Sequence, residues 1–336
     1  MAGSTRYLRT IPGIGWIASL FLGLSVHADP SVVICRGLAN ASGAVRVGEH
    51  RILVGSDDNN ALLLYDARTG GDPIQVFPMS RWLGLSPSDG SVDFEGAARV
   101  GDVVYWIGSH ARNKNGKSRP ERQRLLGLRV SGEDAGVQLT PVARPVTTLL
   151  DSLVTAPALS AFHLGEASRR APESPGGLNI EGLSATPDGG LWIGFRSPVP
   201  AGKALLAPLL NPADVMDGKP ARWGNPAQVD LGDEKGVRDL VWTGRDYFVL
   251  GGNAGDGGKT RLFRWAGPGS EAMAVKVPGL KELNPEALVM FGTPEKPRVL
   301  ILSDDGNRTS NETRDPTQRT FRMLWVEPSM ASSRAE

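Results

Sequence analysis

The chain has 336 residues, with 37 basic and 36 acidic side chains and a formal net charge of +1. This balance offers no basic surface for nucleic acid or for an anionic membrane, so neither partner is expected. A single cysteine excludes an internal disulfide, and the core must therefore hold by packing alone. Forty-two glycines and 25 prolines favour a turn-rich β protein over a helical one.

The N-terminal segment has the order of a secretory signal. Two arginines precede an apolar run at residues 11–26, and a small-residue cleavage site follows the run. A retained membrane anchor is the alternative, but the run is shorter than the ~20 apolar residues that a membrane span needs, and Pro12 interrupts it. We therefore expect a cleaved signal peptide at residues 1–28 and a single domain at 29–336 that is periplasmic or secreted.

A repeated hairpin pattern sets the expected architecture. In four copies, one residue opens a strand and a glycine closes the next strand 13 residues later, with a polar turn between them. The four pairs are Ser42 and Gly55, Glu95 and Gly108, Glu181 and Gly194, and Arg238 and Gly251. A fifth copy with a longer turn begins at Glu286 and ends near Asp304. Constant spacing around a polar turn indicates one structural unit that is used repeatedly.

Each hairpin is followed by further apolar strand patterns, such as residues 61–65, 125–129 and 261–265. Two strands plus one or two more make a propeller blade. Because one blade cannot bury both of its faces, neighbouring blades must stack around an axis. We predict an all-β fold, a β-propeller of about five to seven blades, with a short helical insertion within residues 146–169. A β-sandwich or an open β array with similar hairpins is the alternative.

The direction of the strands gathers charged residues at one mouth of the channel. The first strand of a blade lines the channel and the second returns antiparallel beside it, so the residues that open one strand and close the other meet at the same end. The predicted metal ligands there are Asp57, Glu95, Glu181, Glu286 and Asp304. The predicted contacts to an anionic substrate are His110, Arg112, Arg196 and Arg238.

A concentration of carboxylates at the mouth has two interpretations. It is unfavourable unless a cation or a buried arginine neutralises it, and Ca²⁺ above all is the expected occupant. Alternatively, a Glu-Gly pair that opens a blade ties neighbouring blades together through hydrogen bonds to backbone amides, since a joint is needed in every blade and a catalytic residue only once. Arg238 replaces glutamate in the fourth copy, where it would pair with the other acids or bind an anion.

The loop at residues 110–124 is the strongest run of charge in the chain. It begins at the mouth, because the second strand of its hairpin ends there. The loop would either fold over the mouth and contact a phosphate or carboxylate, or remain a solvated loop without a partner.

Two pairs of strings, residues 94–98 with 105–114 and 177–183 with 205–212, resemble a bacterial family known as domain of unknown function 3616. The resemblance extends over most of the mature chain, and the family carries no established activity. The string at 179–183 is also similar, over a much shorter stretch, to the Glu-Gly motifs of exported phytase-like and esterase-like propeller proteins. That second resemblance implies a Ca²⁺-assisted phosphoester hydrolase, in which acids hold the metal and basic residues hold the phosphate.

Two functions are therefore compatible with the sequence. One is a hydrolase of a small anionic, phosphoester-like molecule, and the other is a non-catalytic propeller that binds a ligand or a protein. No motif places an attacking group, and fold alone implies neither function. An open mouth with charged groups free of structural partners would favour the enzyme, whereas glutamates bonded to backbone amides of the adjacent blade would favour the scaffold.

Overall fold

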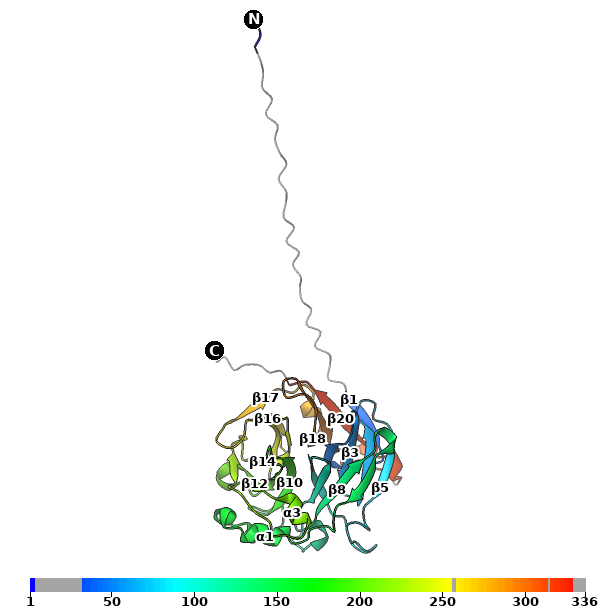
Figure 1. The fold of residues 1–336 in the computed structure, drawn as a ribbon, viewed down its shortest axis with the longest axis vertical. Helices are drawn as coiled ribbons and strands as arrows, with labels where there is room; N and C mark the ends of the chain where they lie inside the picture. Colours follow the sequence, from blue (N-terminus) through cyan, green and yellow to red (C-terminus); the bar gives the residue numbers. More distant parts are fainter. Residues whose placement is uncertain (4–31, 256–257, 314, 329–336) are drawn as a thin grey trace.

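A computed structural model describes residues 1–3, 32–255, 258–313 and 315–328. The predicted signal peptide lies outside these residues, apart from its first three. Figure 1 shows five sheets arranged around a central channel, and each sheet has four antiparallel strands. The prediction of a β-propeller is confirmed, with five blades in the described part of the chain.

Blades 1 to 4 take their strands in chain order from the channel outward. Blade 1 contains β2 (Ala41–Arg46), β3 (Arg51–Ser56), β4 (Ala61–Asp66) and β5 (Gln75–Pro78). Blade 2 contains β6 (Phe94–Val100), β7 (Val103–Gly108), β8 (Leu125–Ser131) and β9 (Gln138–Pro141). Blade 3 contains β10 (Asn179–Ala185), β11 (Leu191–Ser197), β12 (Ala204–Leu209) and β13 (Ala227–Val229). Blade 4 contains β14 (Lys235–Trp242), β15 (Tyr247–Asn253), β16 (Arg261–Trp265) and β17 (Ala272–Val275).

Blade 5 closes the ring with strands from both ends of the described chain. It contains β18 (Pro285–Gly292), β19 (Pro297–Ser303), β20 (Thr320–Val326) and, outermost, β1 (Val32–Arg36). The first strand pairs antiparallel with β20, so that Cys35 lies opposite Phe321. The Cys35 thiol is buried, and burial raises its pKa to about 12. The antiparallel pairing of β1 with β20 joins the N-terminal strand to the C-terminal blade through backbone hydrogen bonds.

Two of the four closing glycines of the repeat, Gly55 and Gly194, make room for the adjacent blade. A Cβ atom at Gly55 would lie 2.8 Å from the Trp106 ring of blade 2, and one at Gly194 would lie 2.7 Å from Val237 of blade 4. Trp106 is fully buried and packs edge-to-face on Phe94, with ring centroids 5.5 Å apart. At these two positions the glycine in the repeat marks a close approach between neighbouring blades.

The long gap between the second and third hairpins holds helices instead of a further blade. The α-helices in this gap are α1 (Leu149–Thr155) and α2 (Leu164–Ala167), whereas α3 (Pro212–Met216) lies between β12 and β13 of blade 3. The 3₁₀ turns are η1 (Pro120–Arg122), η2 (Asp134–Gly136), η3 (Pro157–Phe162), η4 (Pro200–Gly202), η5 (Leu280–Glu282), η6 (Thr309–Asn311) and η7 (Pro316–Gln318). Leucines of α1, η3 and α2 pack on the cluster between blades 2 and 3, as the helical spacing predicted. Figure 1 shows α1 and α3 at the edge of the propeller, away from the chain ends.

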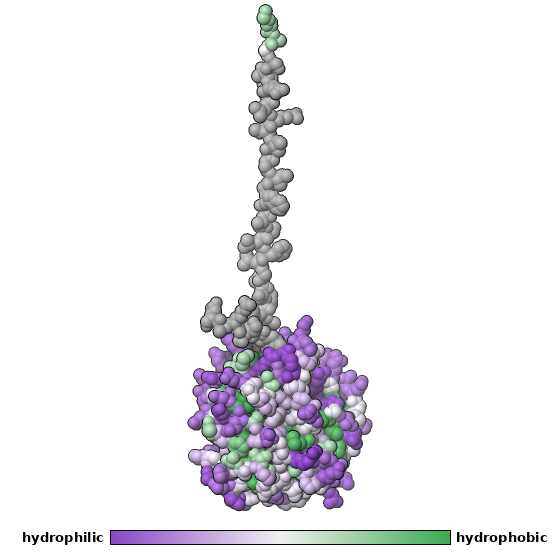
Figure 2. Space-filling view, turned by 60° about the vertical axis from the view of Figure 1, so that its left-hand side comes forward, coloured by the Kyte–Doolittle hydropathy of each residue, from purple (hydrophilic) through white to green (hydrophobic). Residues whose placement is uncertain are grey.

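Figure 2 shows a largely hydrophilic outer surface in which apolar residues form separate patches. Most large apolar side chains of the strands are buried between blades. None of the helices in the described ranges is long and apolar enough to cross a membrane.

Candidate functional site

Each innermost strand has a β-bulge at the residue that opens the repeat. The strand register shifts between Phe94 and Gly96 in blade 2, and in the same way at the corresponding place in every other blade. The skipped residues are Ser42, Glu95, Glu181, Arg238 and Glu286. A bulge leaves one residue out of the ladder and redirects its side chain. Five bulges at one level therefore present five side chains to the same mouth of the channel.

Four charged residues form a buried ion network at this level. The Arg238 guanidinium forms an ion pair with Glu286, and its Nε lies 3.6 Å from Oε2 of Glu181. Arg196 donates a hydrogen bond of 2.9 Å to the other carboxylate oxygen of Glu181. We call Glu181, Arg196, Arg238 and Glu286 the Arg238 network. Four residues from three blades are thereby joined across the channel.

Burial and charge oppose one another in this network. Burial lowers the pKa of Arg238, but Glu181 and Glu286 outweigh burial and raise it. Burial raises the pKa of Glu286 to about 8, against the stabilising effect of the Arg238 charge. Arginine in the fourth copy of the repeat therefore neutralises the glutamates of the third and fifth copies, as one of the two sequence interpretations expected.

The blade joint expected of the glutamates is made by another residue. Asp239 accepts hydrogen bonds from the backbone N–H groups of Leu240, at 2.8 Å, and of Leu288 in blade 5, at 2.7 Å. The hydrogen bonds of Glu181 come instead from the side chains of Asn179 and Arg196. The two residues of a Glu-Gly pair have different roles: the glutamate faces the mouth, and the glycine allows close packing of blades.

Gly96 illustrates the second role. A Cβ atom there would lie 2.8 Å from the carbonyl oxygen of Glu181 in blade 3 and 2.9 Å from Leu183. Any larger side chain at this position would force blades 2 and 3 apart.

A polar cavity of about 440 Å³ lies at the mouth beside the Arg238 network. Its acidic lining residues are Asp57, Asp93, Glu95, Glu173 and Glu181, and its cationic ones are Lys114, Arg119, Arg122 and Arg196. We call this space the mouth cavity. Six of its lining residues, from Ala111 to Arg122, belong to the basic loop, and the other nine lie outside this loop. Of the two conformations considered for the loop, the structure shows the one that folds over the mouth.

Burial and mutual repulsion raise the pKa values of the carboxyl groups in this cavity. Burial, followed by the charges of Asp58, Asp93 and Asp304, raises the pKa of Asp57 to about 7. Burial, followed by Asp93, Glu181 and Asp57, raises the pKa of Glu95 well above its usual value. Burial also raises the pKa of Asp93, although Arg122 lies 2.7 Å from its carboxylate and opposes the effect.

Glu95 differs from the other charged residues that open the repeats. Glu181, Arg238 and Glu286 pair with one another, whereas Glu95 has no hydrogen bond or ion pair to any residue that the structure describes. Its side chain is partly exposed and lines the mouth cavity. A half-buried carboxyl group without a structural partner is available to a ligand.

Two of the predicted substrate contacts support the loop rather than line the cavity. His110 is buried, with a left-handed backbone (φ 55°) and its Nδ1 2.8 Å from the carbonyl oxygen of Gly108. Burial lowers its pKa to about 4. Arg112 donates to the carbonyl oxygens of Ser168 and Gly116, both at 3.0 Å, and so fixes the basic loop against the end of α2.

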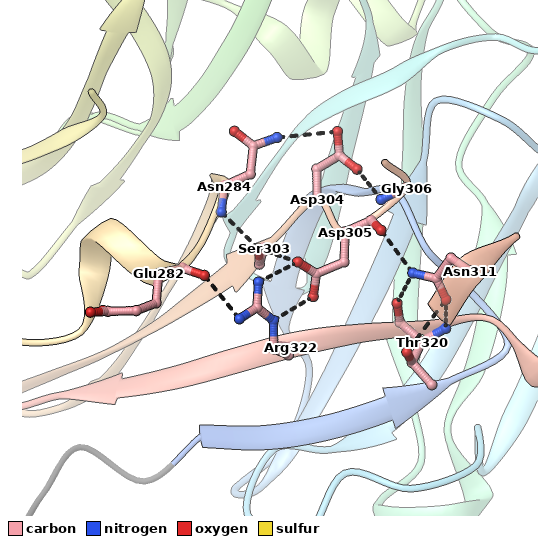
Figure 3. A network of polar contacts seen from close by, with 9 residues as sticks. All are labelled: Glu282, Asn284, Ser303, Asp304, Asp305, Gly306, Asn311, Thr320 and Arg322. Carbon is pink, nitrogen blue, oxygen red and sulfur yellow. Dashed lines mark hydrogen bonds and ion pairs between the residues drawn. The ribbon is translucent and has the colours of Figure 1, made fainter. Parts of the chain in front are cut away.

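Asp304 is turned away from the mouth cavity. Figure 3 shows its carboxylate directed toward Asn284 and the Gly306 amide, with bonds of 3.4 and 2.8 Å. The neighbouring carboxylate of Asp305 is held by Arg322. Burial raises the pKa of Asp304, and its charge also acts on Asp57.

The five predicted metal ligands are therefore not gathered into one set. Asp57, Glu95 and Glu181 line the mouth cavity, whereas Glu286 is paired with Arg238 and Asp304 is bonded elsewhere. Across the described ranges, no three His, Cys, Asp or Glu side chains are grouped so that they could hold a metal ion. Calcium binding stays a prediction.

The sequence did not single out Arg119 and Arg122 as individual lining residues. Both belong to the charge run at 110–124, which was the available signal, but their direction depends on the 3₁₀ turn η1. Arg122 reaches back to Asp93, and Arg119 pairs with Glu121.

A family model described as "Protein of unknown function (DUF3616)" matches residues 142–308. The predicted resemblance to DUF3616 is confirmed over this stretch. The DUF3616 match contains all four members of the Arg238 network and excludes Asp57 and Glu95. No curated protein matches the chain.

Solved structures resemble this chain at low sequence identity. The major allergen Mala s 1 of Malassezia sympodialis is 11% identical, with a TM-score of 0.52, over 88% of this chain and 95% of that one. Glutaminyl cyclase from Myxococcus xanthus is 10% identical, with a TM-score of 0.45, over 89% and 96%. At such identities the likeness concerns the fold alone.

Proposed function

We propose that the protein is a hydrolase of a small anionic, phosphoester-like molecule, which binds in the mouth cavity and reacts by proton transfer from Glu95. The observation that carries this proposal is the state of Glu95: a partly exposed carboxyl group with a strongly raised pKa and no partner among the described residues. Strongly perturbed groups in a cleft are typical of functional sites. The predicted export would place the activity outside the cytoplasm.

The charge of the cavity favours an anion. Four cationic side chains line the cavity together with five carboxyl groups. With Asp57 and Glu95 both protonated, the cations outnumber the remaining carboxylates by one, and once Asp57 ionises to act as a base the two numbers are equal. Arginine side chains then offer planar donor groups that suit phosphate oxygens. A cavity of about 440 Å³ accepts a small organic molecule.

The two raised carboxyl groups have complementary roles in the proposed reaction. Asp57, with a pKa of about 7, is partly ionised at neutral pH and takes a proton from the attacking water. Glu95 remains protonated and donates its proton to the leaving oxygen as the ester bond breaks. The water oxygen forms the new bond to phosphorus, and the alcohol leaves with the proton from Glu95. Solvent then returns a proton from Asp57 to Glu95.

A calcium-assisted form of this reaction is the competing proposal from the sequence. Repulsion among Asp57, Asp93 and Glu95 would be relieved by a cation as well as by protons. Because Arg238 already neutralises Glu181 and Glu286, the donor set around the cavity does not fit a metal ion well. We derive no step through calcium.

Thermal unfolding distinguishes these two proposals. We expect the melting temperature of the mature protein to stay unchanged within about 1 °C between EDTA and millimolar Ca²⁺, because protons already neutralise the carboxyl groups. A ligand at 100 times its Kd would add about 2.7 kcal/mol to the free energy of unfolding. A rise of several degrees with Ca²⁺ but not with Mg²⁺ would therefore replace the proton-based proposal by a metal-based one.

The activity test compares three proteins on p-nitrophenyl phosphate, bis-p-nitrophenyl phosphate and p-nitrophenyl esters between pH 5 and 8. We expect saturable hydrolysis by the wild type and a loss of about 100-fold or more in kcat for Glu95→Gln, since general acid catalysis contributes that much. Glu133→Gln changes an exposed glutamate of the same blade, outside the mouth cavity, and should retain full activity.

Three other results would contradict the proposed activity. Equal kcat in the wild type and Glu95→Gln would remove Glu95 from the reaction. Binding of inorganic phosphate, measured by calorimetry, without turnover of any ester would identify a binding propeller instead of an enzyme. If phosphate neither binds nor is released, the mouth cavity does not recognise this class of molecule.

A further inference from the structure

A second cavity, of about 450 Å³, lies along the innermost strands of all five blades. It is lined by the segments 44–48, 97–99, 183–185, 241–242 and 288–290, which follow the bulged residues of the mouth along each strand. The strands run from the mouth toward the opposite face, so this space lies at the other end of the channel. We call it the basal cavity.

The basal cavity exists because three innermost strands carry small side chains. Ala44 in β2, Ala97 and Ala98 in β6, and Ser184 and Ala185 in β10 line it. The remaining two strands contribute larger apolar groups, including Trp242 and Met290. Side chains ordinarily fill the central channel of a small barrel or propeller. Alanines on one side leave the space open and make its wall apolar.

The Arg238 network separates the two cavities. Glu181 precedes the basal residue Leu183 on β10, and Glu286 precedes Leu288 on β18. Because Glu181, Arg238 and Glu286 are buried and paired at the level between the two sets of lining residues, we expect a ligand in one cavity not to contact a ligand in the other. The basal cavity is therefore a site apart from the proposed hydrolytic site.

Two arginines stand at the rim of the basal cavity. Arg46 and Arg99 come from adjacent strands, β2 and β6, and both line the space. Each uses its Nε to bond a backbone carbonyl, that of Gly48 at 2.8 Å and that of Gly101 at 3.0 Å. Arg46 also lies over the Phe291 ring at 4.9 Å. Neither is in a salt bridge within the described ranges, so their terminal nitrogens are available to an anion.

We propose that the basal cavity binds an amphiphilic monoanion: a chain or ring of about ten to fifteen non-hydrogen atoms that carries one carboxylate or sulfonate. The apolar part lies against the alanines and Leu288, and the anionic group lies between Arg46 and Arg99. The lining contains no acidic side chain that would repel it. This inference is independent of the activity proposed for the mouth.

The experiment titrates the mature protein with decanoate, below its micelle concentration, by calorimetry. We expect one site with a Kd on the order of 100 µM or tighter, from burial of the alkyl chain together with the charge. Decyltrimethylammonium, with the same chain and the opposite charge, should bind at least about tenfold more weakly.

Three variants complete the test. Arg46→Gln with Arg99→Gln should raise the Kd of decanoate about tenfold or more, because both charged donors are lost. Ala185→Phe, at a half-buried position of the wall, should fill the space and reduce binding at least as much. Arg129→Gln removes an exposed arginine of blade 2 outside the cavity and should leave the Kd unchanged.

The proposal is overturned if decanoate does not bind to the wild-type protein. It is also overturned if the double arginine variant and Ala185→Phe both bind decanoate as tightly as the wild type does. Equal affinity for decanoate and decyltrimethylammonium would contradict the anionic selectivity. If Ala185→Phe fails to fold, as judged by circular dichroism, the double variant of Arg46 and Arg99 at the rim still decides the outcome.

Discussion

Replacing Arg238 by methionine is expected to lower the free energy of unfolding by about 3–5 kcal/mol, because the change leaves two buried carboxylates without their cation. Arg238 is 8% exposed and contacts both Glu181 and Glu286. Methionine retains much of the apolar volume, so the measured loss reports mainly the charge. Urea unfolding at pH 7, monitored by tryptophan fluorescence, gives the difference.

The pH dependence of this loss identifies its cause. Without Arg238, the folded state raises the pKa of Glu286 further above its unfolded value, so the variant loses stability as pH rises. The deficit should therefore shrink between pH 7 and pH 5. Arg129→Met is the matched control: its ion pair with Asp102 is exposed, and its loss should cost about 0–1 kcal/mol. A deficit for Arg238→Met that is equally small, or constant with pH, would contradict the network.

The blades could be predicted from the sequence because the repeat arises from a packing constraint. Each closing glycine leaves no room for a Cβ atom, because the next blade approaches it, as Trp106 does at Gly55, or a neighbouring loop does, as at Gly108, and this constraint recurs at fixed spacing. The sequence allowed five to seven blades, because the gap from Val130 to Gly177 is long enough for one more. Leucines at helical spacing within this interval pointed to its actual content, α1 and η3.

Closure of the ring was not visible in the sequence. Cys35 and Met323 contact one another although 288 residues separate them. The sequence of a short apolar strand such as β1 does not indicate which distant strand it pairs with. Pairing of this kind is specified by the whole fold rather than by a local pattern.

The convergence of charges at the mouth could be predicted, but their individual roles could not. Strand direction placed Glu95, Glu181, Arg238 and Glu286 together, because it depends only on topology. Which carboxylate each arginine contacts depends on side-chain geometry at the bulges. His110 was predicted to contact the substrate, but its backbone is left-handed and its imidazole ring is buried. Asp239 was overlooked because a buried aspartate that caps amides has no spacing signature.

Asp57→Asn is expected to make the protein more stable than the wild type at pH 8, on the order of 2 kcal/mol, and to have little effect at pH 4. Burial and neighbouring acids raise the pKa of Asp57 to about 7 in the folded protein, above its unfolded value. The folded state then binds more protons than the unfolded state between about pH 4 and 7, so the stability of the wild type falls as pH rises through this interval. Asparagine cannot ionise and avoids this loss.

Urea unfolding at pH 4, 6 and 8 provides the measurement, and Asp72→Asn, at an exposed position of the same blade, is the control that should follow the wild-type profile. Parallel pH profiles for Asp57→Asn and the wild type would mean that Asp57 is already ionised throughout, and the proton transfer proposed for it would lose its basis. In the expected case, one titration has two consequences. The ionisation that destabilises the fold above neutral pH also creates the base that activates water, so hydrolysis should rise over the same pH interval in which stability falls.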